Sequence, residues 1–378
     1  MLQTARKSRR AKGFTLLELL VAMIIGSLIV LALLTLVVQL TETNQKDAAR
    51  TQVQQDMQSA MDYVAQDLRS AVFVYNGECL QGKAGPSFAK SCPGIINYIP
   101  TTINDDPLEK VPVLAFWRTK ELPKKIRDLC GADPNPEQLG SDKPEVVNNN
   151  IMTKAKVPCL AGYSYSLVVY SLDSTDDENI WNGKARLKRY ELSQFGSNPT
   201  NQDDQTKGFV DPLAEPELTF QQWPLKSGTG GVVVDRQKDA VEAKKPGLPE
   251  GAAVTLVDFV DTETDGDTAS APKCQEFGDD DEGRNRSLSP ITISPTNPPF
   301  RSFYACVRDG GIVTQITNPV TGKPVNPPST NQDVLLVLKG NVSGQGGFSK
   351  TNNTDNSERI SPLQTRVLVR GIVGKKDE

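Results

Sequence analysis

A single carboxylate lies at the start of a long apolar run, and its position suggests a specific role. The run opens with Phe14-Thr15-Leu16-Leu17-Glu18, and Leu19–Val38 then contains only two polar residues, Ser27 and Thr35. An ionised carboxylate that faces hydrocarbon costs a few kcal/mol. Glu18 therefore needs a positively charged partner, or it must extend its side chain to the polar surface of a membrane. Both alternatives concern ion pairing or solvation and not catalysis.

A second group of acidic residues alternates around a glycine, as in the first half of a calcium-binding loop. The candidate calcium ligands are Asp261, Glu263, Asp265 and Asp267. The twelfth position of such a loop needs a glutamate that binds through both oxygens, and Pro272 occupies it here. The sequence therefore favours a solvated acidic loop. We predict no cofactor and keep calcium as the alternative.

Six cysteines are spread along the chain without any Cys-x-x-Cys pair, which argues against a zinc site. They are Cys79, Cys92, Cys130, Cys159, Cys274 and Cys306. An even number of dispersed cysteines beyond a membrane segment indicates disulfides in an oxidising compartment, and buried free thiols are the alternative. We expect nearest-in-sequence pairing, 79–92, 130–159 and 274–306, because it closes short loops.

The composition argues against several classes of function. None of the 378 residues is histidine, which removes Ser-His-Asp and Cys-His nucleophile pairs and the commonest transition-metal ligand. No phosphate-binding loop or nucleotide fingerprint occurs, so we predict that the protein is not an enzyme. The net charge is −4 and the first thirteen residues carry +5, so the remainder carries −4 − 5 = −9. An acidic body argues against nucleic acid as a partner.

Some surface features could contact an acidic polysaccharide. They are the basic cluster Lys124-Lys-Ile-Arg127, the nearby pair Arg284 and Arg286, and a tryptophan in a polar loop, Trp181, which could stack on a sugar ring. Ordinary surface charge and core packing of the tryptophans are the favoured interpretation.

The element that must position Glu18 is a long helix preceded by a basic leader. Residues 1–13 form the leader, and residues 14–40 contain an apolar segment about as long as a bilayer core is thick. This segment is longer than the core of a secretory signal and lacks a small-residue cleavage site after it, so we expect it to remain in the mature protein. The positive leader predicts a cytoplasmic N-terminus and a body across the membrane.

The pattern of residues 41–76 predicts that this helix continues along the body. Apolar residues recur every three or four positions and so share one helical face. They are Val53, Met57, Met61, Val64, Leu68 and Val72. Packing on the chain's own core explains this stripe better than a separate coiled coil. Neither glycine nor proline interrupts the segment from Thr41 to Val74, and Asn76-Gly77 is the expected stop signal.

Residues 77–378 predict short strands separated by long loops. β-branched and aromatic residues gather in the candidate strands, which are 111–117, 163–170, 185–192, 254–260, 334–338 and 365–373. We expect the last two strands to be neighbours, 173–183 to be a hairpin loop, 185–192 to have an exposed face, and 341–361 to be mobile. An amphipathic helix on an antiparallel sheet gives an α+β fold of two layers.

The opening motif Gly13-Phe14-Thr15-Leu16-Leu17-Glu18-Leu19, with its basic leader and apolar helix, resembles the class III signal of type IV prepilins and pseudopilins. The resemblance implies that a prepilin peptidase cuts between Gly13 and Phe14 and methylates the new terminus at Phe14. It also implies that Glu18 pairs with the N-terminal amine of a neighbouring subunit during filament assembly. Many major pilins carry a proline within the apolar helix. This chain has none there, so local helix melting is not implied.

Residues 55–72 are similar to the helix of large, minor PilW-like pilins, and residues 60–75 resemble pseudopilins of cyanobacterial hormogonium polysaccharide secretion. These resemblances imply a pilin-like fold, and a minor pilin or pseudopilin that passes from the inner membrane into a type IV pilus or a type II secretion-like pseudopilus. Polysaccharide secretion or gliding motility is the implied process. The implied partners are the prepilin peptidase, other pilin or pseudopilin subunits, the inner-membrane assembly platform and a polysaccharide.

Two other classes of function are weighed against assembly. The first is an adhesin or ligand-binding protein displayed on a membrane or filament, which binding of polysaccharide by the body would distinguish. The second is a membrane-anchored enzyme, which the missing histidines and catalytic motifs disfavour.

Overall fold

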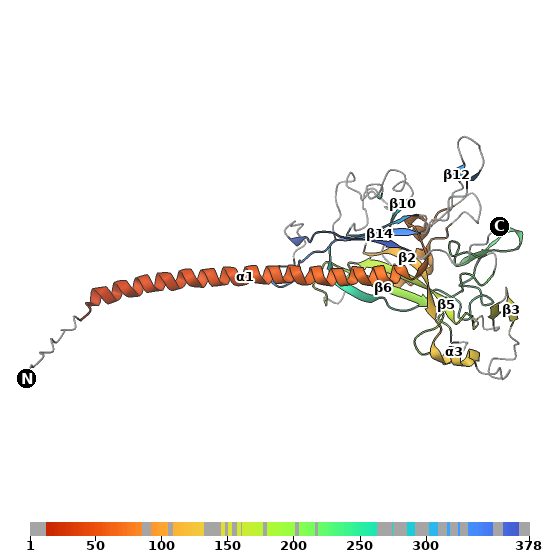
Figure 1. Ribbon diagram of the computed structural model, residues 1–378, viewed down its shortest axis with the longest axis horizontal. Helices are drawn as coiled ribbons and strands as arrows, with labels where there is room; N and C mark the ends of the chain where they lie inside the picture. The colour runs from red at the N-terminus through yellow and green to blue at the C-terminus, as the bar shows by residue number, and fades with distance from the viewer. Residues whose placement is uncertain are drawn as a thin grey trace, which may run out of the picture.

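The protein consists of a long helix that projects from a β-rich body, as the computed structural model shows (Figure 1). The structure describes residues 13–84, 92–104, 109–131, 145–147, 150–152, 157–159, 161–176, 180–200, 204–215, 218–262, 274, 286–291, 302–308, 316–317, 324–325, 332–350 and 358–369. An α+β fold with antiparallel sheets is therefore confirmed.

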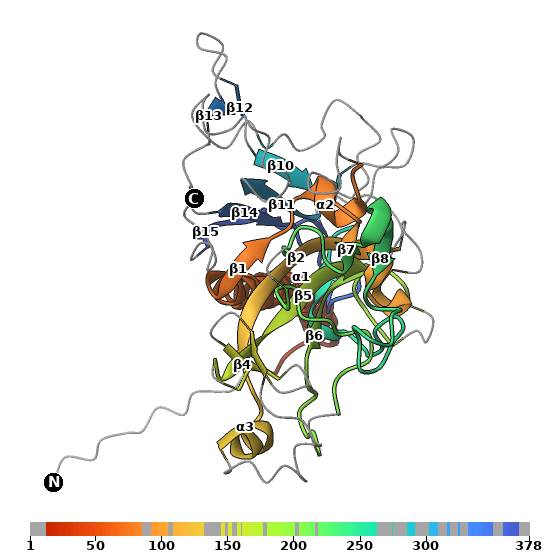
Figure 2. The same cartoon turned by 90° about the vertical axis from the view of Figure 1, so that its right-hand side faces the viewer.

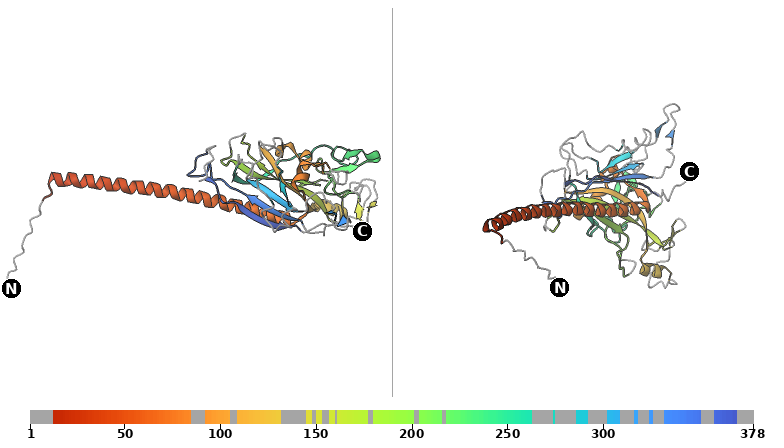
Figure 3. Two further views of the ribbon diagram at one scale, coloured as in Figure 1. Left: turned by 90° about the horizontal axis from the view of Figure 1, so that it is seen from above. Right: turned by 60° about the vertical axis from the view of Figure 1, so that its left-hand side comes forward.

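Helix α1 runs from Leu16 to Arg69, and its 54 residues span about 80 Å at the usual helical rise. Thr15 is the N-cap and Ser70 is the C-cap. The first part of α1 extends away from the body, whereas its last part lies against the sheets (Figure 3). The expected continuity of the apolar and amphipathic segments is confirmed.

The end of α1 differs from the prediction, which extended the helix to Val74 and stopped it at Asn76-Gly77. Residues Ala71–Val74 instead form strand β1. Their β-branched and aromatic side chains favour a strand once a partner is present, and that partner is β2 (Lys110–Glu121). Asn76 begins a helix rather than ending one, because its side chain caps the first turn of α2 (Gly77–Gln81).

A five-stranded antiparallel sheet has the order β1-β2-β5-β6-β9. Strands β5 (Tyr163–Asp173), β6 (Ala185–Ser193) and β9 (Val254–Val260), together with β2, coincide with the first four predicted strands. Strands β5 and β6 pair directly, which confirms the hairpin connection between them. The expected exposed face of β6 is wrong, because both faces of this sheet are covered and even Arg186 is fully buried.

A four-stranded antiparallel sheet lies beside the first, in the order β10-β11-β14-β15 (Figure 2). Its strands are β10 (Arg286–Ser289), β11 (Phe303–Arg308), β14 (Asp333–Leu338) and β15 (Leu363–Leu368). The pairing of β14 with β15 confirms that the last two predicted strands are neighbours. The side-chain amide of Gln332 joins the sheets by bonding both backbone groups of Val74, at 2.8 and 3.0 Å.

Shorter elements occupy the connections between these strands. The helical ones are α3 (Lys124–Gly131), η2 (Ile95–Tyr98), η3 (Thr101–Ile103) and η4 (Thr229–Gly231). Two-stranded ribbons pair β3 (Glu145–Val147) with β4 (Asn150–Met152), β7 (Leu225–Ser227) with β8 (Val233–Asp235), and β12 (Ile316–Thr317) with β13 (Pro324–Val325).

The main core lies between α1 and one face of both sheets. The strands present alternate residues to it. Along β14, even-numbered side chains face α1, whereas Leu335 and Val337 face the opposite side. The predicted apolar stripe supplies the helical half of this core, which confirms its packing on the chain's own body. Its buried members are Val53, Met57, Met61, Val64 and Leu68.

The other face of the five-stranded sheet is also covered, so this part of the body has three layers and not two. The segments 204–215 and 218–250 pack over it, with Trp223 against Trp117 of β2. The two indole rings lie 5.2 Å apart in an edge-to-face arrangement. The indole N–H of Trp117 donates to the hydroxyl of Tyr75 at 2.8 Å. Both tryptophans are therefore core residues.

Candidate functional site

The start of α1 holds the candidate processing and assembly residues. The Thr15 hydroxyl accepts a hydrogen bond from the N–H of Glu18 at 3.3 Å. One Glu18 carboxylate oxygen accepts bonds from the N–H and hydroxyl of Thr15 at 3.0 and 3.1 Å. This capping box places Glu18 in the first helical turn, where the helix dipole also favours negative charge. Phe14 is 85% exposed, and no atom lies within 4 Å of the position that a Cβ on Gly13 would take. The Gly13–Phe14 bond is therefore accessible.

The segment Leu16–Leu40 of α1, here called the free segment, is exposed and packs on none of the body residues that the structure describes. Large apolar side chains from Phe14 to Leu40 are between 45% and 91% exposed. The hydroxyls of Ser27 and Thr35 both donate at 2.8 Å to backbone carbonyls of the same helix. Glu18 is the only charged residue between Phe14 and Leu40. Helix α1 is long and apolar enough to cross a membrane, and its most apolar stretch is not buried in the body.

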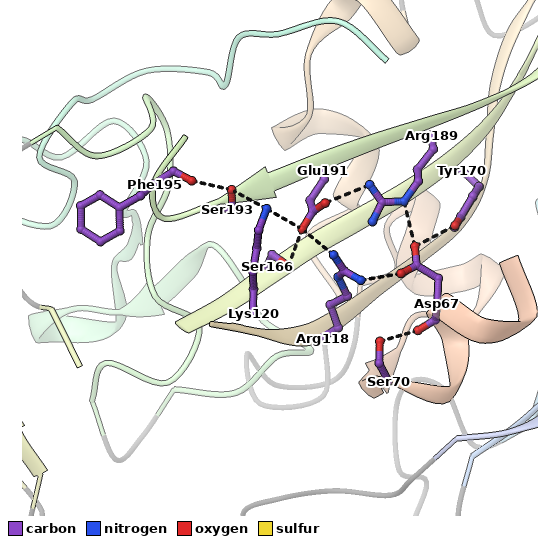
Figure 4. A network of polar contacts seen from close by, with 10 residues as sticks. All are labelled: Asp67, Ser70, Arg118, Lys120, Ser166, Tyr170, Arg189, Glu191, Ser193 and Phe195. Carbon is purple, nitrogen blue, oxygen red and sulfur yellow. Dashed lines mark hydrogen bonds and ion pairs between the residues drawn. The ribbon is translucent and has the colours of Figure 1, made fainter. Parts of the chain in front are cut away.

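A buried ionic network fastens the other end of α1 to the five-stranded sheet (Figure 4). Asp67, only 6% exposed, accepts a hydrogen bond from Arg118 of β2 at 2.6 Å through one oxygen. Its other oxygen accepts from Arg189 of β6 and from the hydroxyl of Tyr170 of β5, both at 2.8 Å. Burial and the neighbouring Asp67 raise the pKa of Tyr170, so its hydroxyl remains a donor. One helical carboxylate thus binds three adjacent strands.

Glu191 of β6 is the second carboxylate of this network. It lies 3.0 Å from Arg118, 3.0 Å from Lys120 and 2.9 Å from Arg189. Burial raises the pKa of Glu191, but Lys120, Arg118 and Arg189 together outweigh burial and lower it to about 2. Because each charge is held by several partners, removing one of them leaves an uncompensated charge inside the body.

The position of Asp67 in the sequence indicates a buried carboxylate, although the apolar periodicity by itself did not predict it. Asp67 follows Val64 by three positions and Ala60 by seven, so it lies in the same helical row as these buried residues. A carboxylate in such a row must be paired with cations. Arg118 and Arg189 lie on predicted strands, but the register that brings them to Asp67 is a property of the folded sheet.

Residues 339–350, here called the brace, lie against α1 near the point where the helix leaves the body. Gly340 approaches so closely that a Cβ there would collide with the sulfur of Met57. Gly347 has a φ of 88°, a conformation that favours glycine. It lies close to the side chain of Lys46. The described part of the loop that we expected to be mobile therefore packs on the helix.

Two further contacts hold the brace. The guanidinium of Arg50 on α1 lies 5.5 Å from the ring centroid of Phe348. At the end of the brace, the ammonium of Lys350 lies 2.8 Å from the carboxylate of Asp176, in the connection after β5. The brace thus links α1 to the rim of the five-stranded sheet.

Two of the expected disulfides are present. Cys79 is joined to Cys92 with a Cα–Cα distance of 4.9 Å, and Cys274 is joined to Cys306 at 5.5 Å. Cys159 is also disulfide-bonded, whereas the side chain of its expected partner, Cys130, lies outside the described residues. The Cys79 bridge attaches α2 to the segment before η2, and the Cys306 bridge attaches residue 274 to β11.

The candidate calcium ligands are described only at Asp261. One of its oxygens accepts a hydrogen bond from the amide of Asn341 at 3.0 Å, and the other lies 3.4 Å from Arg359. Glu263, Asp265 and Asp267 lie outside the described residues. Within the described part of the chain, no group of three or more acidic or cysteine residues is arranged to hold a metal. The calcium site stays a prediction.

The residues considered for sugar contact differ in their partners and in their burial. On α3, Lys124 pairs with Asp128 at 2.7 Å, and Arg127 pairs with Glu121 of β2 at 3.3 Å. Trp181 is half-buried, with the guanidinium of Arg186 5.1 Å from its ring centroid. Arg284 and the side chain of Arg286 lie outside the described residues.

Comparison with known proteins identifies the start of the chain. A family model for the prokaryotic N-terminal methylation motif matches residues 8–34. This segment is a type IV pilin-like class III signal. It includes Gly13, Phe14 and Glu18 and most of the free segment. No curated protein and no solved structure matches the chain.

The methylation motif supports a type IV pilin-like or pseudopilin-like protein, and the proteins that carry this motif are of a structural-subunit kind. In general, the motif implies processing by a prepilin peptidase and assembly with other pilin subunits. Together with the apolar free segment, it fits a membrane-anchored protein with a single transmembrane pass.

Proposed function

We propose that the chain is a minor pilin or pseudopilin subunit. In this proposal the prepilin peptidase cuts between Gly13 and Phe14, Phe14 is methylated, and the subunit leaves the inner membrane for a type IV pilus or a type II secretion-like pseudopilus. Before extraction, the N-terminus is cytoplasmic and the body is periplasmic or extracellular. The observation that carries the proposal is the methylation motif on a projecting helix with exposed apolar sides.

The single charge of the free segment supports the assembly step. One carboxylate oxygen of Glu18 accepts both bonds from Thr15, and its other oxygen accepts no bond from the residues that the structure describes, so it can accept one from a cation. An N-terminal amine of a neighbouring subunit would neutralise Glu18 in an apolar filament core, where an unpaired carboxylate is costly. The apolar sides of the free segment would then pack against those of neighbouring subunits, with the body facing outwards.

The finer assignment concerns the secretion system. The likeness of residues 60–75 to the pseudopilin HpsC supports a role in polysaccharide secretion or gliding motility. The partners would then be other pseudopilins, the inner-membrane assembly platform and a secreted polysaccharide.

Mass spectrometry of the mature N-terminus tests the proposal most directly. In cells with an active prepilin peptidase, we expect a chain that begins at methylated Phe14. Retention of residues 1–13 in those cells would contradict processing. A processed chain that never co-purifies with filaments would instead favour a membrane-displayed binding protein.

A further inference from the structure

A cavity with a mixed polar and apolar lining lies at one end of the five-stranded sheet, beside the buried ionic network. Its volume is about 310 Å³, at the lower end of the range for small-molecule sites. The end of β2, the start of β5 and the segment that follows β6 form its walls. The lining includes Lys120, Ser164, Ser193, Phe195 and Ser197. Three serines and one lysine thus line a space large enough for a small molecule with polar groups.

One hydroxyl in this cavity lacks a partner. Ser164 is only 6% exposed and lines the cavity, yet among the described residues its hydroxyl makes no hydrogen bond. Ser193 differs, because its hydroxyl donates to the carbonyl of Phe195 at 2.8 Å. A hydroxyl that is not already bonded within the protein can bond a ligand without first breaking an internal hydrogen bond. Ser164 is therefore available to a ligand that enters the cavity.

The adjoining network carries an excess of positive charge. Arg118, Lys120 and Arg189 face two carboxylates, Asp67 and Glu191, which gives 3 − 2 = +1. Glu121, also in the lining, is paired with Arg127 of α3. This local excess contrasts with the net charge of −9 that the chain carries beyond its leader.

Lys120 brings this excess charge to the cavity wall. Its ammonium forms an ion pair with Glu191 at 3.0 Å and donates to the Ser193 hydroxyl at 3.4 Å, so these two partners take at most two of its three N–H donors. It is also the most exposed cation of the network. The third donor can therefore bind an anion in the cavity.

We propose that this cavity binds a carboxylated sugar unit of the hexuronic acid type. The carboxylate would accept the third N–H of Lys120 and balance the network, while ring hydroxyls would bond Ser164 and Ser197. A neutral sugar would leave the excess charge unbalanced, and a small anion would leave Ser164 unpaired. This inference concerns the body alone and goes beyond the assembly function, so either can fail without the other.

Ligand-observed NMR titration of the full-length chain in detergent tests the proposal with three probes. They are D-glucuronate, D-glucose, which keeps the hydroxyls without the charge, and acetate, which keeps the charge without the hydroxyls. We expect glucuronate to bind at least about tenfold more tightly than either control, because only it satisfies both the ammonium and the hydroxyl. Equal affinity for glucuronate and glucose, or for glucuronate and acetate, would overturn the proposal.

Substitutions of the lining residues test whether glucuronate binds in this cavity. Lys120→Gln should weaken glucuronate binding about tenfold, and Ser164→Ala about threefold. Lys125→Gln, which removes the same charge from α3 outside the lining, should leave the affinity within about twofold. Lys120→Arg should retain binding, which separates loss of the cation from loss of the fold, and thermal melting of each variant checks its folding. Unchanged binding in folded Lys120→Gln and Ser164→Ala proteins would contradict the proposed site.

Discussion

The two ends of α1 belong to one continuous helix but have opposite surroundings. In the free segment, Leu16–Leu40, apolar side chains are exposed and Glu18 bonds its own helix cap, Thr15. From Lys46 to Arg69, here called the anchored segment, one face is buried and Asp67 is bound by three strands. The free segment has one carboxylate, Glu18, and the anchored segment has one buried carboxylate, Asp67. Among the residues that the structure describes, Asp67 has cationic partners and Glu18 has none.

The two segments therefore have their residue types determined by different surroundings. In the anchored segment, periodicity follows from the chain's own sheets, which require an apolar row and satisfied charges. The free segment is apolar on all sides, as expected of a helix whose surroundings are supplied by something other than the chain's own body. Substitutions should therefore affect folding in one segment and processing or assembly in the other.

The largest expected effect is complete loss of leader removal in a variant whose body stays folded. Gly13→Val places a branched side chain beside the bond to be cut, and no neighbouring atom in the fold is disturbed. We expect intact-mass measurement to show full retention of the leader, with an unchanged melting temperature. Gly26→Val, at the second glycine without neighbours in this part of the chain, is the matched control and should be processed normally. Normal leader removal in the Gly13→Val variant would contradict the assignment of processing to the start of α1.

Removal of the anchored carboxylate should be the most destabilising change in the body. Asp67→Ala leaves Arg118 and Arg189 without their shared partner, and we expect a loss of about 3–5 kcal/mol in the free energy of unfolding. Asp62→Ala, on the exposed side of the same helix, should change it by less than about 0.5 kcal/mol. Chemical denaturation of the full chain in detergent measures both. Similar values for the two variants would mean that the network contributes little.

The same leucine substitution in the two segments gives a more graded test. Leu68 is fully buried, so Leu68→Ala should cost about 2–5 kcal/mol of unfolding free energy through lost burial and a cavity. Leu28 is 61% exposed, so Leu28→Ala should change body stability by less than about 0.5 kcal/mol. An effect of Leu28→Ala on filament recovery, without an effect on unfolding, would sharpen the division between the segments.

The smallest expected effect is a pH dependence confined to the anchored segment. Burial raises the pKa of Glu191, but Lys120, Arg118 and Arg189 lower it to about 2, below its ordinary value of 4.5. A depressed carboxyl pKa stabilises the fold above the ordinary value, and this stability is lost as pH falls from 4.5 towards 2. The melting temperature should therefore decrease across that window. The melting temperature of the Glu191→Gln variant should fall less steeply over the same pH range. An equal slope for the variant and the unchanged protein would show that other groups control acid unfolding.

The sequence was sufficient where a local pattern and its physical cause lie within the same few residues. The strands β5, β9 and β14 follow from β-branched and aromatic runs, and the stripe from Val53 to Leu68 follows from helical period. The methylation motif likewise occupies one short stretch. Nearest-in-sequence pairing also gave the two disulfides whose cysteines are both described.

The sequence was insufficient where a partner distant in the chain decides the conformation. Val72 fits the helical stripe, yet pairing with β2 draws Ala71–Val74 into a strand. The brace is rich in glycine and polar residues, which suggested mobility, but those glycines permit close contact with α1. The network around Asp67 depends on the alignment of three strands, which no short pattern encodes.

The brace holds α1 at the last point before the free segment leaves the body. From Lys46, which contacts Gly347, the helix runs about 48 Å to Phe14 at the usual rise, so it acts as a lever arm. A change of about 10° at the brace would move Phe14 sideways by about 8 Å, more than one helical pitch. A loop more than three hundred residues from Gly13 therefore contributes, with the buried face of α1, to the angle at which the start of the helix is held.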